Sequence, residues 1–181
     1  MRRSLRGGAG APEAAGHVYR CSCSRKQIAA RVLPSADGEL PYDGLCRNLE
    51  STKGGIRIEL GGGAEFFLDG LLGEQSQDPS VQCGDLLLRD RSSQWTYQFA
   101  VTVDDLIQDV DLVVRGEDLL PSTGRQIRLG KLLGREQAAL FVHHPLIRDD
   151  DGGKLSKKEA SAPIRETRRK GVPPQQVLGS A

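Results

Sequence analysis

The sequence lacks several features that would at once assign a protein to a class. No apolar run approaches the ~18 residues that a membrane-spanning helix needs, and residues 1–17 contain no apolar segment of the kind found in secretion signals. Only four cysteines occur in 181 residues, which is too few for a disulfide-stapled scaffold. We therefore expect a soluble, cytoplasmic protein with reduced thiols and no membrane partner.

A charge excess of one sign is lacking too, because 25 Lys and Arg face 24 Asp and Glu, for a net charge of +1. Nucleic-acid binding through global charge is therefore excluded, although a local basic face is not. Aromatic residues reach only 4%, but a hydrophobic content of 38% is enough for a packed core. The length fits one domain, on a typical range of ~100–200 residues.

Hydrophobic patterning predicts strands alternating with helices. We expect strands within 56–60, 65–72, 85–90, 95–103 and 111–116, the fourth running into a helix that begins at Asp104 and Asp105. Helices are expected over 25–32, capped by Ser24, over 123–133, capped by Ser122 or Thr123, over 164–170, and from 173 onward. The segment 73–84 is expected to be a polar loop. This alternation predicts an α/β fold with a largely parallel sheet.

Cys21, Cys23, Tyr42 and Cys46 form the first candidate site. The C-x-C pair places two thiols on one turn, and Y-x-x-x-C returns a third thiol after a turn-rich segment. Zinc prefers thiolates in a tetrahedral set, and Tyr42 can supply a phenolate as the fourth donor if the metal lowers its pKa. Ordinary reduced thiols are the alternative. Cys83 stands apart and is expected to be a small buried residue.

Tyr97 and Arg115 form the second candidate site, each expected near the end of a parallel strand, where α/β sheets bind ligands. A Tyr hydroxyl and a guanidinium fork can hold an amino-acid substrate, with the Arg binding a carboxylate through two hydrogen bonds. The alternative is that Arg115 pairs with Glu117 or Asp118 on the surface.

The third candidate site is the run KLSKK at 154–158, which follows three acids and two glycines. Lys154 and Lys157 can reach phosphate oxygens together, and a mobile loop can close over a leaving pyrophosphate. A solvated basic loop is the alternative reading.

Taken in order, these motifs resemble class I aminoacyl-tRNA synthetases. KLSKK resembles the KMSKS-type signature, and YQFAVTVDD and VVRGEDLLPSTGRQIRLGKLLG resemble the glutamate-specific branch. HVYRCSCSRKQI, with the later Y-x-x-x-C, is similar to the zinc knuckle of the glutamyl-Q tRNA(Asp) synthetase family, a shortened relative of glutamyl-tRNA synthetase without an anticodon-binding domain. The resemblance runs from about His17 to Gly179.

The resemblance implies a Rossmann-like class I catalytic domain with a small zinc-binding insertion. It also implies that glutamate and ATP, with Mg²⁺, form glutamyl-adenylate and pyrophosphate, and that the glutamyl group passes to the queuosine base of tRNA(Asp). A monomer is expected. The positions that match the family's motifs are Tyr97 and Arg115 for glutamate, Lys157 for ATP with Lys154 as an auxiliary charge, and Cys21, Cys23, Tyr42 and Cys46 for one structural zinc.

The sequence departs from the family's pattern near its start. His17, His143 and His144 are its three histidines, and none lies in a HIGH-type motif. We therefore expect a catalytic domain that is incomplete at its N-terminus, with a disordered leader at 1–16, the zinc-binding insertion at 17–50 and the rest of the domain at 51–181. For the same reason we expect that this chain alone does not form glutamyl-adenylate, and that a sheet edge and apolar surface are exposed.

Two other functions stay open at this point. One is a fragment of a glutamyl-tRNA synthetase that charges tRNA 3′ ends. The other is an inactive, zinc-stabilised tRNA-binding remnant, in which the basic stretch RETRRKG at 165–171 contacts phosphates.

Overall fold

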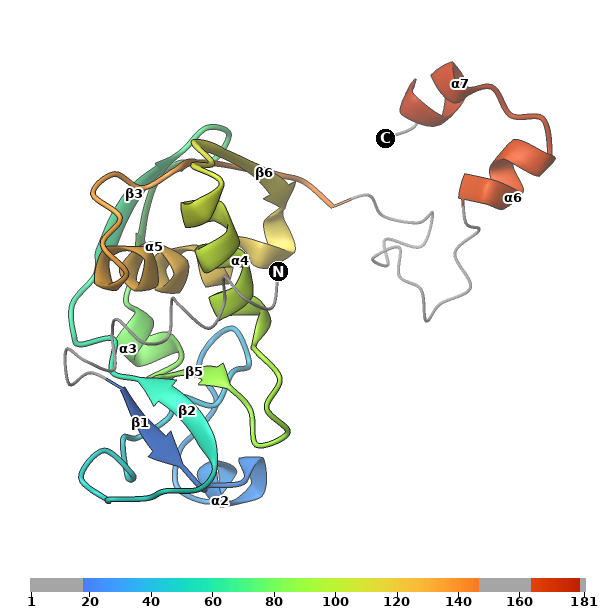
Figure 1. Ribbon diagram of the computed structural model, residues 1–181. Helices are drawn as coiled ribbons and strands as arrows, with labels where there is room; N and C mark the ends of the chain where they lie inside the picture. The colour runs from blue at the N-terminus through green and yellow to red at the C-terminus, as the bar shows by residue number, and fades with distance from the viewer. Residues whose placement is uncertain (1–17, 147–163, 180–181) are drawn as a thin grey trace.

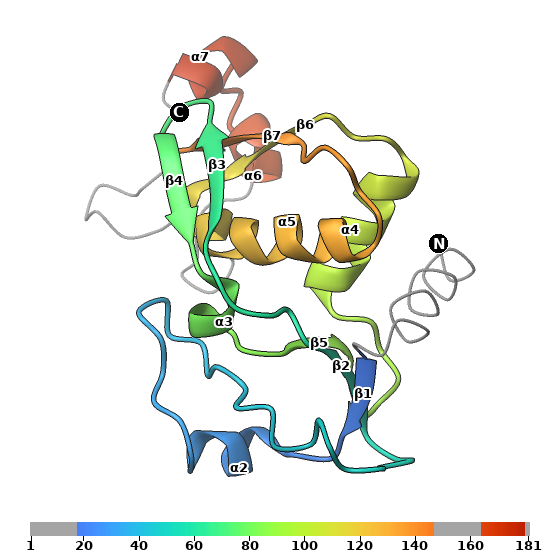
Figure 2. The ribbon, with the colours of Figure 1, turned by 90° about the vertical axis from the view of Figure 1, so that its left-hand side faces the viewer.

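The computed structural model describes residues 18–146 and 164–179, and most of these form two sheets with the central helices between them (Figures 1 and 2). In chain order the elements are β1 (Val18–Cys21), α2 (Arg25–Ala29), β2 (Gly55–Ile58), β3 (Glu65–Asp69), β4 (Gly73–Gln77), α3 (Pro79–Gln82), β5 (Leu86–Arg89), α4 (Tyr97–Ile107), β6 (Leu112–Gly116), the 3-10 helix η1 (Glu117–Ser122), α5 (Thr123–Leu132), β7 (Leu140–His144), α6 (Ile164–Arg169) and α7 (Pro174–Gly179). The expected α/β class is confirmed.

The two sheets differ in strand direction. The first has the order β1-β2-β5 and is antiparallel throughout. The second has the order β4-β3-β7-β6, in which β7 is parallel to both β3 and β6, while β4 is antiparallel to β3. The expectation of a largely parallel sheet is therefore confirmed for β3, β7 and β6, but it is wrong for the first sheet and for β4. For β4 the physical reason is the short turn at 70–72, which can close only an antiparallel hairpin.

The segment predicted as a strand at 95–103 is instead the start of helix α4. Its buried side chains are Phe99, Thr102 and Val103, which are three and four residues apart and so lie on one face of a helix. Thr96 precedes it in an extended conformation. The β-branched and aromatic composition favoured a strand, but burial of this one face against α5 and β5 decides for a helix.

The segment 73–84, expected to be a loop, contains β4 and α3. Asp78 ends the strand and begins the helix, because its carboxylate accepts a hydrogen bond from the Ser80 backbone N–H at 2.9 Å. Pro79 follows at the first helical position, where its missing N–H costs nothing. The polar residues of β4 thus form an edge strand that pairs with β3.

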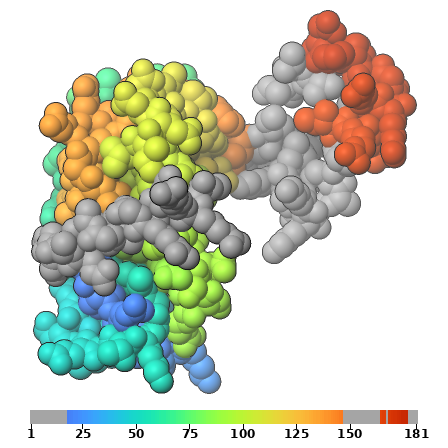
Figure 3. Space-filling model, in the orientation of Figure 1, coloured from blue at the N-terminus to red at the C-terminus, as the bar shows by residue number. Residues whose placement is uncertain are grey.

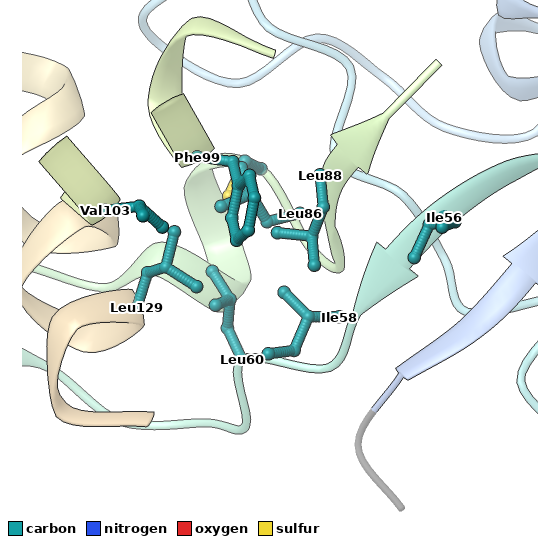
Figure 4. Packing of buried hydrophobic residues seen from close by; sticks show 9 residues of the cluster. Ile56, Ile58, Leu60, Leu86, Leu88, Phe99, Val103 and Leu129 are labelled. Atoms are coloured by element: carbon teal, nitrogen blue, oxygen red, sulfur yellow. The ribbon is translucent and has the colours of Figure 1, made fainter. Parts of the chain in front are cut away.

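The main core lies between the first sheet and the two central helices (Figure 4). β2 and β5 contribute Ile58, Leu86 and Leu88, and the helices contribute Phe99, Val103 and Leu129. Ile58, Leu88, Phe99 and Leu129 have no exposed surface. Removing one such side chain typically costs ~2–5 kcal/mol, so this core fixes α4 and α5 relative to the first sheet.

The second sheet buries only one of its faces. Glu65 and Asp69 of β3 face the buried side, whereas Phe66 and Leu68 alternate to the other side and are exposed. Val114 of β6, which lies at an edge of the described sheet, is also exposed. The expectation of an exposed sheet edge and apolar surface is therefore confirmed for the described residues.

Helices α6 and α7 stand apart from the body of the molecule, as the ribbon and space-filling views show (Figures 1 and 3). The expected helix at 164–170 is confirmed with bounds Ile164–Arg169. Within the described ranges, no helix has the length and apolar character needed to cross a bilayer.

Candidate functional site

The three cysteines of the C-x-C and Y-x-x-x-C motifs converge on one point. The sulfurs of Cys21, Cys23 and Cys46 all lie within 4.8 Å of one another, and all three thiols are free. The Tyr42 hydroxyl lies 3.2 Å from the Cys21 sulfur and 3.6 Å from the Cys23 sulfur. We call these four residues the Cys₃Tyr cluster. Cys83 is buried apart from the cluster, as expected.

Local structure places each donor of the Cys₃Tyr cluster. β1 ends at Cys21, and α2 begins after Cys23 through a capping box in which Ser24 and Gln27 bond each other's backbone. Tyr42 is held by its backbone, which donates a 2.9 Å hydrogen bond to the Cys83 carbonyl and bridges Gly84. A Cβ at Gly84 would lie 2.1 Å from the Tyr42 carbonyl oxygen, so only glycine permits this approach.

The donor geometry of the Cys₃Tyr cluster fits a tetrahedral metal ion. Zn–S bonds of about 2.3 Å put two thiolates about 3.8 Å apart, and a phenolate oxygen about 3.5 Å from each sulfur. The Cys23 and Cys46 sulfurs are 3.7 Å apart, and the Tyr42 oxygen lies at 3.2 and 3.6 Å from two sulfurs. Three soft sulfurs and one oxygen suit zinc better than a hard cation.

Two arginines place positive charge beside the Cys₃Tyr cluster. The Arg31 guanidinium lies 3.8 Å from the Cys23 sulfur and pairs with Asp43 at 2.7 Å, which lowers the pKa of that carboxyl. The Arg57 guanidinium stacks on the Tyr42 ring at 3.9 Å. Burial among the thiols raises the pKa of Tyr42, so its ionisation would depend on a bound cation.

Arg115 is buried at the second candidate site, and three of its nitrogens are bonded to the protein. Nε donates to His143 Nε2 at 3.0 Å, one terminal nitrogen donates to Gln126 Oε1 at 2.7 Å, and the other donates to Thr123 Oγ1 at 2.8 Å. The side chain comes from β6, and Thr123 and Gln126 come from the first turns of α5. The alternative of a surface ion pair with Glu117 or Asp118 is therefore wrong.

Among the described residues, no carboxylate forms an ion pair with Arg115, although Asp105 and Asp69 raise its pKa from farther away. All three bonding groups are neutral if His143 is neutral, and no carboxylate of residues 18–146 and 164–179 lies within 4.0 Å of the guanidinium. Burial accordingly lowers the pKa of Arg115. A buried charge is normally paired, so this site favours an anionic ligand.

Tyr97 neighbours the same guanidinium, since its side chain interacts with Arg115 electrostatically. It is the first residue of α4 and half exposed, rather than the end of a strand as expected. The structure therefore brings Tyr97 and Arg115 together, although by a different element from the predicted one. α4 is tied to α5 here, because Gln126 donates to Gln98 at 2.7 Å and Gln98 donates to Ser122 at 2.8 Å.

Four residues around Arg115 were missed by sequence reasoning. Thr123 was considered as a helix cap, but no side-chain capping bond is formed there, and its hydroxyl bonds Arg115 instead. Gln126, His143 and Asp69 are the other three. The available signal was that Arg115 and His143 each follow an apolar run in a strand. A buried polar side chain needs a hydrogen-bond partner, and a polar residue on a neighbouring strand can supply it.

A groove of about 640 Å³ lies between the Cys₃Tyr cluster and the segment that leads from β5 into α4. Arg57, Asp85, Thr96, Gln98 and Arg125 are among its walls. Tyr97 and Arg115, which form the second candidate site, do not line this groove. Lys154 and Lys157, the third candidate site, lie outside the described residues.

Comparison with protein families gives a match over residues 14–180 to the class I tRNA synthetase (E and Q) catalytic domain. Among curated proteins, the chain is 44% identical over 151 residues to a glutamyl-Q tRNA(Asp) synthetase of Geobacter sulfurreducens, covering 81% of this chain and 48% of that protein. A protein of the same name from Bordetella bronchiseptica is 43% identical over 158 residues, covering 83% and 49%. The chain thus spans about half the length of the curated relatives it matches.

Comparison with solved structures supports the fold. A glutamate tRNA ligase from Elizabethkingia meningosepticum, solved in complex with its amino acid, matches with a TM-score of 0.70 at 22% identity. The glutamate-tRNA synthetase of Elizabethkingia anophelis matches with a TM-score of 0.69 at 21% identity. Each match covers 95% of this chain and 37% of the other. The arrangement of strands and helices is therefore that of a class I synthetase catalytic domain.

Proposed function

Because the chain belongs to the class I tRNA synthetase (E and Q) catalytic-domain family, we propose that it forms part of a ligase that activates glutamate with ATP and transfers it to queuosine in tRNA(Asp). The names of its relatives in Geobacter sulfurreducens and Bordetella bronchiseptica support this choice within the family. The described residues bear mainly on one step of this reaction, the recognition of glutamate.

The observation that carries the proposal is the buried Arg115 guanidinium with only neutral partners. Glutamate must leave its α-carboxylate free to react with ATP, so the group to be held is the side-chain carboxylate. A fixed, charged fork binds a carboxylate strongly and binds the neutral amide of glutamine much less well. Tyr97, beside the guanidinium, can donate its hydroxyl hydrogen to the same carboxylate.

In the proposed reaction, an oxygen of the α-carboxylate attacks the α-phosphorus of ATP, and pyrophosphate leaves. A nucleophile of the queuosine base then attacks the acyl carbon, and AMP leaves. Such a step depends on positioning and on neutralising phosphate charge. We assign Lys154 and Lys157, with Mg²⁺, to the phosphates of ATP, since the KLSKK sequence supplies two closely spaced cations.

We assign one zinc ion to Cys21, Cys23, Tyr42 and Cys46, on the distances and donor types given above. When bound, zinc supplies a tetrahedral cross-link between the end of β1 and the loop that carries Tyr42 and Cys46. Beside the cluster, Arg31 pairs with Asp43 and Arg57 stacks on the ring of Tyr42, and these contacts hold the surrounding side chains in place. The proposed zinc-binding insertion at 17–50 contains all four donors. A monomer that acts in the cytoplasm completes the proposal, and the four free thiols support a reducing compartment.

The test is transfer of radiolabelled glutamate by the protein that carries this chain, with ATP and one of three RNAs. We expect label on queuosine-containing tRNA(Asp) and none on the same tRNA that lacks queuosine. Label on the 3′ end of tRNA(Glu) would instead favour a glutamyl-tRNA synthetase. Binding of tRNA without any transfer would favour the inactive remnant.

A further inference from the structure

His143 and Asp69 form a buried relay behind Arg115. The His143 ring is fully buried, with Nδ1 2.5 Å from Asp69 Oδ2 and Nε2 3.0 Å from Arg115 Nε. Asp69 comes from β3, His143 from β7 and Arg115 from β6, so the relay crosses three neighbouring strands of the second sheet.

The relay works only with one form of the imidazole. Arg115 Nε–H can only donate, so His143 Nε2 must carry a lone pair to accept. The ring proton must then sit on Nδ1, where the Asp69 carboxylate accepts it. The Thr123 hydroxyl, 3.2 Å from Nε2, accepts from Arg115 and can donate to the same nitrogen.

We propose that Asp69 and His143 are positioning residues for glutamate recognition, because the carboxylate selects the His143 tautomer that holds the Arg115 fork. This inference rests on the proposed role of Arg115 in binding glutamate. The relay fixes the plane of the guanidinium while leaving its charge unneutralised for the substrate. A carboxylate in direct contact with Arg115 would also fix the fork, but it would compete with the ligand.

The structure makes Asp69→Asn an unusually sharp test. Asp69 Oδ1 accepts hydrogen bonds from the backbone N–H groups of Leu71 and Leu72, both at 3.0 Å, and of His143 at 3.3 Å. An asparagine must place its only oxygen there, so its NH₂ faces His143 Nδ1. That NH₂ donates, which moves the ring proton to Nε2 and leaves Arg115 Nε–H facing another donor.

The experiment follows the His143 ring nitrogens and the Arg115 Nε–H by ¹⁵N NMR, and measures glutamate affinity by calorimetry, in the wild-type chain and in the variant. We expect the Nδ1–H tautomer and a protected Arg115 Nε–H in the wild type. In Asp69→Asn we expect the Nε2–H tautomer, loss of that protection, and about tenfold weaker glutamate binding, the loss typical of one charged hydrogen bond. Asp85→Asn is the matched control, because Asp85 is equally buried but pairs with Arg47 and not with His143. It should leave tautomer and affinity unchanged.

The outcomes separate the two claims. A wild-type chain with Nε2 protonated overturns the relay, and this measurement needs no variant. An inverted tautomer with unchanged glutamate affinity overturns the positioning role. A wild-type chain that shows the expected tautomer but does not bind glutamate overturns the proposed function of Arg115 while the relay itself stands.

Discussion

At the residue scale, the chemistry of this molecule depends on side chains whose ionisation is set by their neighbours. Burial lowers the pKa of Arg115, while Tyr97, Asp105 and Asp69 act in the opposite direction. Asp69 keeps its charge because His143 and three backbone N–H groups donate to it. Neither role could be identified from the sequence, because His143, which joins the two side chains, lies on another strand.

The ionisation of Asp69 gives a prediction about acid stability. Burial would raise the pKa of Asp69, but the hydrogen bonds from His143, Leu72 and Leu71 outweigh burial and lower it to about 2 from 3.8. Because the folded-state pKa lies below the unfolded one, this carboxylate stabilises the fold above about pH 4, and that contribution is lost as the pH falls toward about 2. Urea unfolding over this range should show a smaller decline for Asp69→Asn than for the wild type. Parallel declines would contradict the assignment.

The four cysteines give a second prediction at this scale. Burial raises the pKa of the Cys83 thiol to about 12, so it should resist alkylation, whereas chelation of a bound metal should free the three cluster thiols to react. We expect mass analysis to find no alkylated cysteine in the zinc-loaded chain and three after chelation. Cys46→Ser should lose its zinc by elemental analysis, and the control Cys83→Ser should retain one ion per chain. Full zinc content in Cys46→Ser would contradict the site.

At the scale of elements, ion pairs connect the loop that precedes Tyr42 to helix α5. The Arg125 side chain is 1% exposed and pairs with Asp37 at 3.1 Å and with Glu39. The same helix supplies Thr123 and Gln126 to Arg115. Arg125 therefore connects the metal-binding segment with the helix that shapes the glutamate site, over 88 residues of sequence.

We expect substitution of Arg125 to lower the free energy of unfolding more than substitution of Glu39, its partner on the loop. Arg125→Met leaves two carboxylates without their partner and loses a buried guanidinium, for an expected cost of about 2–3 kcal/mol in urea unfolding. Glu39→Gln should cost less than about 1 kcal/mol, because Glu39 is 47% exposed and solvent screens its pairing. Equal costs for the two variants would show that Arg125 is not the central residue of the connection.

At the scale of the whole molecule, local signals predicted much of the fold. Ser24 gave the start of α2 correctly, and the strands expected within 56–60, 65–72 and 111–116 are present as β2, β3 and β6. The errors at 73–84 and 95–103 concern segments whose state is decided by contacts with another element, β3 for β4 and α5 for α4. The cysteines of the metal site were identifiable because their residue type and spacing indicate a metal, whereas Thr, Gln and His have many roles and only the fold brings them to Arg115.

The uncovered face of the second sheet gives a prediction for the intact molecule. Phe66 is 78% exposed and Leu68 61% on this face, so the native chain should bind an apolar fluorescent dye. Phe66→Ser with Leu68→Ser should reduce the dye signal, while a matched substitution of the exposed Leu33, which lies in a loop, should not. Unchanged fluorescence in the double variant would show that this face does not form a continuous apolar surface.

The most direct test of the account is a calorimetric titration of the chain with glutamate and with glutamine. We predict at least tenfold tighter binding of glutamate, which is about 1.4 kcal/mol, and loss of that preference in Arg115→Lys, which keeps the charge but not the fork. Arg89→Lys is the control, since Arg89 stacks on Trp95 away from this network. Equal affinity for the two amino acids, or an unchanged preference in Arg115→Lys, would contradict the claim that the unpaired Arg115 recognises the carboxylate of the substrate.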